Sequence, residues 1–216
     1  MPEPAPPVPR GRHAPPLEVR LERQRERLFA AAAAVFARMG YAEASAEAIS
    51  REAGMSKATF YEHFANKEEC ILALFDAAAA QVREAVALST ASGESPEVRV
   101  QQGVQAFLTA LVAFPDHART LLVEIIGAGP KATERHDAIL EDFAELIVRE
   151  NEIAVEQYGA PKLASPDDAY ALVGAIIELA GRQLRRGIPA DMLDLQPVIE
   201  RLVGGLLVAS QPQPSQ

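Results

Sequence analysis

Hydrogen-bond donors are concentrated between Ser45 and Lys67, in the segment SAEAISREAGMSKATFYEHFANK. Ser, Lys, Tyr and His side chains donate to phosphate oxygens, and such contacts position a protein on a DNA duplex. On a helix lying in a groove, Tyr61 and His63 would point to opposite sides, where the phosphates run. Lys67 follows at the start of the next helix, where free amides and positive charge favour an anion. The donor pattern therefore predicts phosphate binding.

Catalysis is the alternative chemistry, and the sequence does not favour it. None of the four histidines stands at a metal-ligand spacing such as H-x-x-x-H. There is no Gly-rich phosphate loop and no nucleophile elbow, and the adjacent acids at 141–142 and 167–168 would face different directions on a helix. We therefore expect no catalytic residue, no metal and no cofactor, and predict that the protein is not an enzyme.

Two short helices with a tight turn would position these donors. Ser45 is expected to cap the first helix, which ends at Ala53-Gly54 because glycine permits a left-handed exit. Ser56 then caps a second helix from Lys57 to about Phe64. Two helices joined by a Gly-containing turn form a helix-turn-helix, whose second helix enters DNA. An ordinary helical hairpin with a polar outer face is the alternative.

The second helix has an inner and an outer face. Phe60 and Phe64 are four residues apart, so they share a face and should point inward. Ala58, Thr59 and Glu62 then lie on the outer face, where base edges would be. Glu62 would either accept a hydrogen bond from a cytosine amino group or only repel phosphate.

The longer run GYAEASAEAISREAGMSKATFYEHFANKEECILALF resembles the DNA-binding domain of TetR-type transcriptional regulators. The matching pieces are Gly40-Tyr41, Ile49 with Ala53-Gly54, Ser56-Lys57, Tyr61-x-His63-Phe64 and Asn66-Lys67-Glu68. The resemblance implies an N-terminal three-helix domain followed by a larger all-helical domain that dimerises and binds an inducer. It also implies that the residues at 45, 57, 59, 61, 63 and 67 contact DNA, although Ala58 stands where glycine is common. Helix geometry and resemblance together predict this DNA-binding set: Ser45, Ser56, Lys57, Ala58, Thr59, Tyr61, Glu62, His63 and Lys67.

The charge distribution fits a DNA-binding N-terminal part. Residues 10–67 carry ten basic and seven acidic side chains, a net charge of +3. Residues 68–216 carry eleven basic and twenty-two acidic side chains, a net charge of −11, and the net charge of the full sequence is −9. A positive region at one end and an acidic remainder would steer DNA towards the motif.

Composition predicts a cytoplasmic protein. The single cysteine excludes an intramolecular disulfide and fits a reducing compartment. No apolar run reaches the roughly 18 residues of a membrane span, and the N-terminus lacks a signal-peptide core. Cys70 is expected to pack as a small apolar side chain, with a redox-sensing role as the alternative.

Strand signals are sparse, so we predict an all-α fold with four segments: residues 1–18, 19–67, 68–211 and 212–216. The first is a disordered Pro-rich arm, in which Arg10 and Arg12 either follow a minor groove or belong to a merely soluble tail. The second is the helix-turn-helix domain, the third binds ligand and dimerises, and the fourth is a tail. Outside the motif, helices are expected over about 21–39, 67–88, 97–114, 116–126, 131–158, 166–187 and 195–210.

The third segment should hold the inducer, a small hydrophobic or amphipathic molecule that releases a repressor from a palindromic operator in double-stranded DNA. Its candidate walls are apolar and its candidate polar anchors are few. The candidate ligand residues are Phe107, Leu111, His117, Leu122, Glu124, Ile125, His136, Phe143, Ile147 and Ile177. The alternative for each apolar residue is ordinary core, and for His117, Glu124 and His136 a solvent-facing position. A dimer that organises DNA without any ligand is a third reading of the protein.

The last two predicted helices carry broad apolar faces, which are either core or a subunit interface. A two-fold DNA reader needs an interface, so we expect a homodimer through a four-helix bundle of these helices. The candidate interface residues are Leu172, Ile176, Ile177, Leu184, Val198, Leu202 and Leu206.

Overall fold

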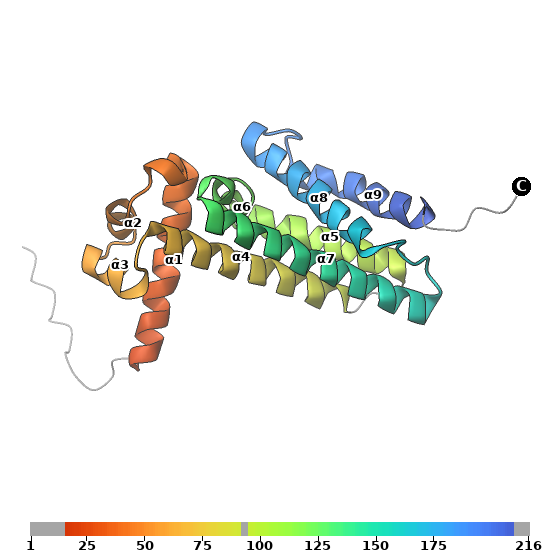
Figure 1. Ribbon diagram of the computed structural model, residues 1–216, viewed down its shortest axis with the longest axis horizontal. Coiled ribbons are helices and arrows are strands. Elements are labelled where there is room, and N and C mark those ends of the chain that lie inside the picture. Colours follow the sequence, from red (N-terminus) through yellow and green to blue (C-terminus); the bar gives the residue numbers. More distant parts are fainter. Residues whose placement is uncertain (1–15, 92–94, 210–216) are drawn as a thin grey trace, which may run out of the picture.

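The computed structural model describes residues 16–91 and 95–209, and every regular element in these ranges is a helix (Figure 1). The α-helices are α1 Leu17–Glu43, α2 Ala46–Glu52, α3 Lys57–His63, α4 Lys67–Thr90, α5 Pro96–Ala113, α6 Pro115–Leu122, α7 Pro130–Tyr158, α8 Pro166–Arg186 and α9 Gln196–Ala209. Two 3₁₀ turns, η1 Glu124–Gly127 and η2 Met192–Leu195, precede α7 and α9. The predicted all-α fold is confirmed. The Pro-rich arm and the C-terminal tail lie outside the described residues.

The N-terminal helix turns where the sequence places a glycine. The assigned helix α1 continues to Glu43, four residues beyond the predicted end, but Gly40 is not helical, with φ 76° and ψ 160°. Glycine adopts this backbone conformation without the steric cost that a side chain adds. Beyond the break, the ring of Tyr41 folds back against Phe36, with the ring centroids 5.9 Å apart. The predicted turn at Gly40 is therefore present.

The single helix predicted over 116–126 is wrong. α6 ends at Leu122, and Val123 leaves the helical conformation at φ −129° and ψ −57°. The 3₁₀ turn η1 follows and carries Glu124 towards α1, where its carboxylate accepts a hydrogen bond from the Tyr41 amide at 3.2 Å. Apolar periodicity cannot reveal such a break, because the side chains on both sides of it are buried.

Helices α1 to α3 form one end of the molecule, and α4 runs from them into the larger helical part (Figure 1). There α4 packs against α5, α7 packs against α8, and α9 lies beside α5 and α8. One apolar core joins both parts, since the buried side chains of Phe36 and Phe60 connect through Phe75 on α4 to Leu121 on α6. The helix-turn-helix is therefore attached through packed helices, and the domain boundary predicted after residue 67 falls at the start of α4, whose first residue is Lys67.

Candidate functional site

The α2–α3 unit is built by the local signals found in the sequence. Ser45 caps α2 by accepting from the Ala48 amide at 3.1 Å, and Ser56 caps α3 by accepting from the Thr59 amide at 3.0 Å. Gly54 makes the turn between the helices with φ +63°, a left-handed conformation that favours glycine. The predicted helix-turn-helix is therefore present as a structure.

The two faces of α3 are those expected from helical spacing. Phe60 and Phe64 are buried, whereas Tyr61 keeps 51% of its surface exposed. His63 is half-buried, with Nε2 lying 3.4 Å from Oε1 of Gln24 on α1. Of the predicted DNA-binding set, Ser45, Ser56, Lys57, Ala58, Tyr61 and Glu62 are exposed, and Thr59, His63 and Lys67 are half-buried. The set shares one end of the molecule, and its contacts with DNA stay predictions.

Basic residues of α1 brace the motif from behind. Arg27 donates through Nη2 to the carbonyl of Ala53 at the end of α2, at 2.7 Å. Arg38 forms an ion pair with Glu52 at 2.8 Å. These contacts fix α2 against α1 and leave the outer face of α3 free, so part of the positive charge counted in the sequence has a structural role.

Lys67 has a role that the sequence did not indicate. Its ammonium donates to the carbonyls of Tyr41, Ala42 and Ala44 at 2.9, 2.9 and 3.0 Å. Nζ also lies 4.6 Å from the centroid of the Tyr41 ring. The lysine therefore caps the chain where it leaves α1. The predicted phosphate contact would use an ammonium group that already donates to three carbonyls.

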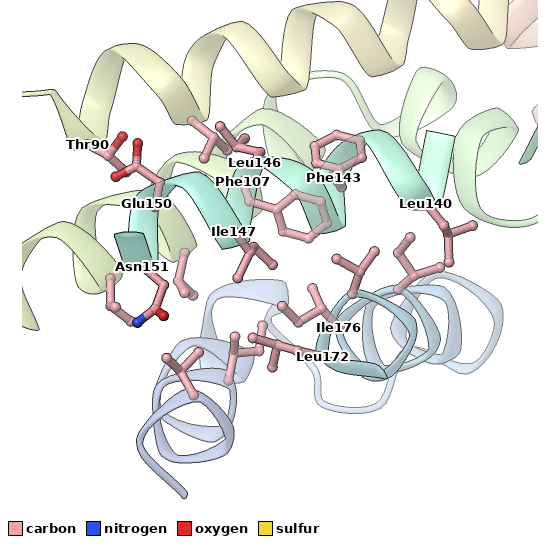
Figure 2. Close-up of a pocket in the computed structure, with 18 of the residues that line it drawn as sticks. Thr90, Phe107, Leu140, Phe143, Leu146, Ile147, Glu150, Asn151, Leu172 and Ile176 are labelled. Atoms are coloured by element: carbon pink, nitrogen blue, oxygen red, sulfur yellow. The ribbon is translucent and has the colours of Figure 1, made fainter. Parts of the chain in front are cut away.

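The helical domain contains an apolar cavity of about 200 Å³, walled by α4 to α9 (Figure 2). Six of the ten predicted ligand residues line it: Phe107, Leu122, His136, Phe143, Ile147 and Ile177. His136 stacks on Phe75, with the ring centroids 6.3 Å apart, at the part of the cavity shared with α4. The structure thus brings the predicted apolar wall together around one space.

The other four predicted ligand residues do not line the cavity. Leu111 and Ile125 are buried in the continuous core. His117 packs its ring edge-on against Phe114 at 5.9 Å, and desolvation by burial lowers the pKa of this histidine, partly offset by the charge of Asp116. Glu124 lies at the contact between α1 and η1. Their assignment to the ligand site stays a prediction that this cavity does not support.

Apart from His136, the polar residues of the cavity were not predicted from the sequence. They are Thr90, Arg99, Glu150 and Asn151, and Figure 2 shows three of them at one end of the row of apolar side chains. Helical spacing could have found two of them, since Arg99 shares a face with Phe107 and Glu150 shares one with Ile147. A charge on an otherwise apolar stripe is the signal.

A polar junction connects the cavity-bearing domain to the helix-turn-helix. Glu124 accepts from the Tyr41 amide at 3.2 Å and from Arg119 Nε at 3.2 Å. Arg119 also donates through Nη1 to the carbonyl of Leu184 on α8, at 3.3 Å. The next residues along α6 include the cavity-lining Leu122, so α6 contacts the cavity, α8 and the DNA-binding part together.

Four of the seven predicted interface residues, Leu172, Ile176, Ile177 and Leu206, line the cavity of their own chain. Leu172 is buried, and Figure 2 shows Leu172 and Ile176 reaching from α8 towards the cavity. Leu184 and Val198 are half-buried, and Leu202 is 38% exposed. One apolar stripe can serve a cavity wall as well as an interface, and the predicted seam on α8 and α9 stays a prediction.

Other chemistry finds little support in the part of the chain that is described. No group of three or more His, Cys, Asp or Glu side chains is placed there to hold a metal ion. Burial raises the pKa of the Cys70 thiol to about 12, which makes it unreactive, and its packing in the core agrees with a structural role. Among the described helices, none has the length and apolar character needed to cross a membrane.

Residues 28–74 match the model of the family described as bacterial regulatory proteins, tetR family. A search of curated proteins returned no match. The match covers α2 and α3 together with most of α1 and the start of α4, so it includes the whole predicted DNA-binding motif.

Solved structures extend the likeness to the helical domain. The fatty acid degradation regulator FadR from Bacillus halodurans superposes with a TM-score of 0.77 at 19% identity, covering 85% of this chain and 96% of that chain. FadR from Bacillus subtilis, in complex with stearoyl-CoA, superposes with a TM-score of 0.74 at 17% identity, covering 87% of this chain and 99% of that chain. A regulatory protein of the tetR family from Rhodococcus RHA1 superposes with a TM-score of 0.66 at 21% identity, covering 88% of this chain and 98% of that chain. The resemblance to TetR-type transcriptional regulators is confirmed, by the family model for residues 28–74 and by these structures for the fold of most of the chain.

Proposed function

We propose that this chain is a ligand-responsive repressor that binds a palindromic operator as a homodimer and is released when a hydrophobic or amphipathic molecule enters the cavity. The observation that carries the proposal is the apolar cavity, because its walls include α4 and α6, the two helices that reach α1. A dimer that only organises DNA would need no such space, so the cavity counts against that alternative.

The DNA-binding surface in this proposal is the outer face of α3 with the starts of α2 and α4. Phosphate contacts come from the donors at its edges, such as Tyr61 and Lys57, and base contacts come from Thr59 and Glu62. The dimer forms through α8 and α9, with the outward side chains of these helices making the seam. Tyr170 and Leu202, which are 41% and 38% exposed, are available for it.

The ligand class follows from the cavity wall, which is apolar over most of its length and polar at one end. A solved neighbour, FadR from Bacillus subtilis, binds stearoyl-CoA, a molecule of that amphipathic character. The likeness to that neighbour is one of fold, so stearoyl-CoA serves here as a probe.

The test begins with selection of the preferred sequence from random duplexes. We expect an inverted repeat whose half-sites are about 34–36 Å apart, one helical turn, or a multiple of it. Adding stearoyl-CoA or an apolar dye such as Nile red should then lower the operator affinity. Probes that occupy the cavity and leave operator affinity unchanged would refute a ligand-responsive role.

A cavity-filling variant gives a matched comparison. Ile147→Phe should retain operator binding and lose the response to the probes, because the larger ring occupies part of a cavity that Ile147 lines. Ile188→Phe makes the same chemical change on a side chain that is 57% exposed and does not line the cavity, so it should respond like the parent protein.

A further inference from the structure

The cavity contains a buried ion pair at its polar end. Arg99 on α5 donates through Nη2 to Oε2 of Glu150 on α7 at 2.6 Å, and both residues line the cavity. The Arg99 side chain is only 10% exposed and that of Glu150 is 26% exposed. An ion pair of this kind on an apolar wall is unusual, because burying charge is costly unless the charges are fully paired and hydrogen-bonded.

The pairing of Arg99 is incomplete. Its Nε–H is buried and has no hydrogen-bond partner, although buried donors in proteins are nearly always paired. Gln102, one helical turn further along α5, also has a buried oxygen without a partner, but it does not line the cavity, and the polar side chains that line it beside Arg99 have partners of their own. Asn151 donates to the carbonyl of Pro161 at 2.9 Å and accepts from the amide of Leu163 at 2.9 Å, and Thr90 donates to the carbonyl of Ala87 at 3.2 Å. The Nε–H of Arg99 is therefore a buried donor without a partner at this end of the cavity.

The charge balance decides which acceptor suits that donor. Glu150 already neutralises the guanidinium at close range, so the pair presents no net charge to a ligand. A ligand carboxylate at Nε would lie near the Glu150 carboxylate, and like charges at short distance repel strongly where the dielectric is low. An uncharged oxygen accepts the same hydrogen bond without that repulsion.

The shape of the cavity also sets the direction in which the apolar part of such a ligand would lie. Arg99 and Phe107 share one face of α5, about 12 Å apart along the helix axis at the rise of an α-helix. Glu150 and Phe143 on α7 repeat this order, with the charged residue at one end and the aromatic residue towards the other. A linear ligand with its oxygen at Arg99 would therefore lie along an apolar stretch that leads to Phe107 and Phe143.

We propose that the cavity selects an amphipathic molecule with an uncharged carbonyl, such as an ester or thioester, whose oxygen accepts from Nε of Arg99 while its apolar chain extends towards Phe107. This inference rests on the proposed function, since it names the class of the inducer. Arg99 and Glu150 act together: Arg99 supplies the donor, and Glu150 rejects free carboxylic acids, which are ionised at neutral pH.

The experiment compares methyl decanoate with decanoate at neutral pH, by calorimetric titration of the full chain. The wild-type protein should bind the ester at least about tenfold more tightly than the carboxylate. Glu150→Gln removes the competing charge without changing the shape, and leaves the charge of Arg99 unbalanced. That variant should reverse the order and bind the carboxylate more tightly than the ester.

Two further variants separate a ligand contact from a structural effect. Arg99→Met alone strands the Glu150 charge and can unfold the domain, so the double variant Arg99→Met/Glu150→Leu is used, with circular dichroism to verify the fold. It should bind methyl decanoate about tenfold more weakly than the wild type. Arg83→Met is the control, since Arg83 pairs with Asp142 at 3.0 Å and does not line this cavity.

The outcomes distinguish this inference from the proposed function. Equal binding of the two probes in the wild type, or an order that Glu150→Gln leaves unchanged, would overturn the role of the ion pair. If neither probe binds while stearoyl-CoA or Nile red still releases DNA, the inference fails and the proposed function stands. If no apolar molecule enters the cavity, both fail.

Discussion

Lys67 allows a decisive test of how a positive charge beside the DNA-binding motif is used. Three carbonyls accept from its ammonium at 2.9 to 3.0 Å. A hydrogen bond to a charged group contributes about 1.5–3 kcal/mol to stability, and three acceptors that share one charge do not add up. Because the lysine is half-buried, water replaces part of the loss. We therefore expect Lys67→Met to lower the free energy of unfolding by about 1.5–2 kcal/mol.

The same variant tests the predicted phosphate contact. Each phosphate neutralised by a lysine contributes about 0.9 to the slope of log affinity against log salt concentration. If Lys67 is mainly a cap, Lys67→Met will keep that slope on random duplex DNA and lower only the stability. If it is mainly a phosphate ligand, the slope will fall by about one and the stability will hardly change.

Urea unfolding and salt-titrated DNA binding of the full chain give both quantities. Lys57→Met is the matched control, since Lys57 is exposed on α3 and its ammonium lies 6.0 Å from the centroid of the Tyr61 ring. That control should lower the slope by about one without a loss of stability. A Lys67→Met protein with unchanged unfolding free energy would refute the capping role deduced from the three carbonyl contacts.

Three other substitutions have defined outcomes. Ile177→Asp should abolish the binding of apolar probes and leave a dimer in sedimentation, because Ile177 lines the cavity; a monomer would return this residue to the interface. His117→Gln should flatten the fall in stability below about pH 6.5. The folded-state pKa of His117 is lowered by burial, so on acidification the unfolded chain takes up a proton first, and urea unfolding at several pH values would detect it. Glu124→Gln should reduce the ratio of operator affinities without and with stearoyl-CoA, since it weakens the contact with Tyr41; an unchanged ratio would exclude this contact from the coupling.

Local signals made the helix-turn-helix predictable. Ser45 and Ser56 accept from amides in the first turns of α2 and α3, and the glycine between these helices has the left-handed conformation that a sharp exit requires. Each of these features depends on residues at most three positions apart, so single-sequence reasoning finds it. The buried face of α3 follows as well, because Phe60 and Phe64 are one helical turn apart.

Features that depend on distant parts of the chain were not predictable. The apolar stripe of α8 reads the same whether it lines a cavity or a dimer seam, and only the packing of α7 and α9 around Ile177 distinguishes these roles. The bonds of Lys67 span at least 23 residues, so no local pattern reports them. An apolar pattern on its face of α5 does not predict Arg99, although a buried charge among apolar residues identifies the polar end of the cavity.

The proposed coupling between the cavity and DNA requires a free energy that can be compared with that of the contact at Glu124. A hundredfold loss of operator affinity requires about 2.7 kcal/mol of difference between the two states, and by reciprocity the operator weakens ligand binding by the same factor. One hydrogen bond to a charged acceptor contributes about 1.5–3 kcal/mol, so the contact of Glu124 with the Tyr41 amide is of the right magnitude if only one state makes it. Leu122, two residues before Glu124, lines the cavity, so a ligand that displaces it acts at the break between α6 and η1. The continuous helix α4 can carry a rigid rotation, but the proposed switch also needs a contact that exists in only one state, and we propose the contact of Glu124 with the Tyr41 amide for that role.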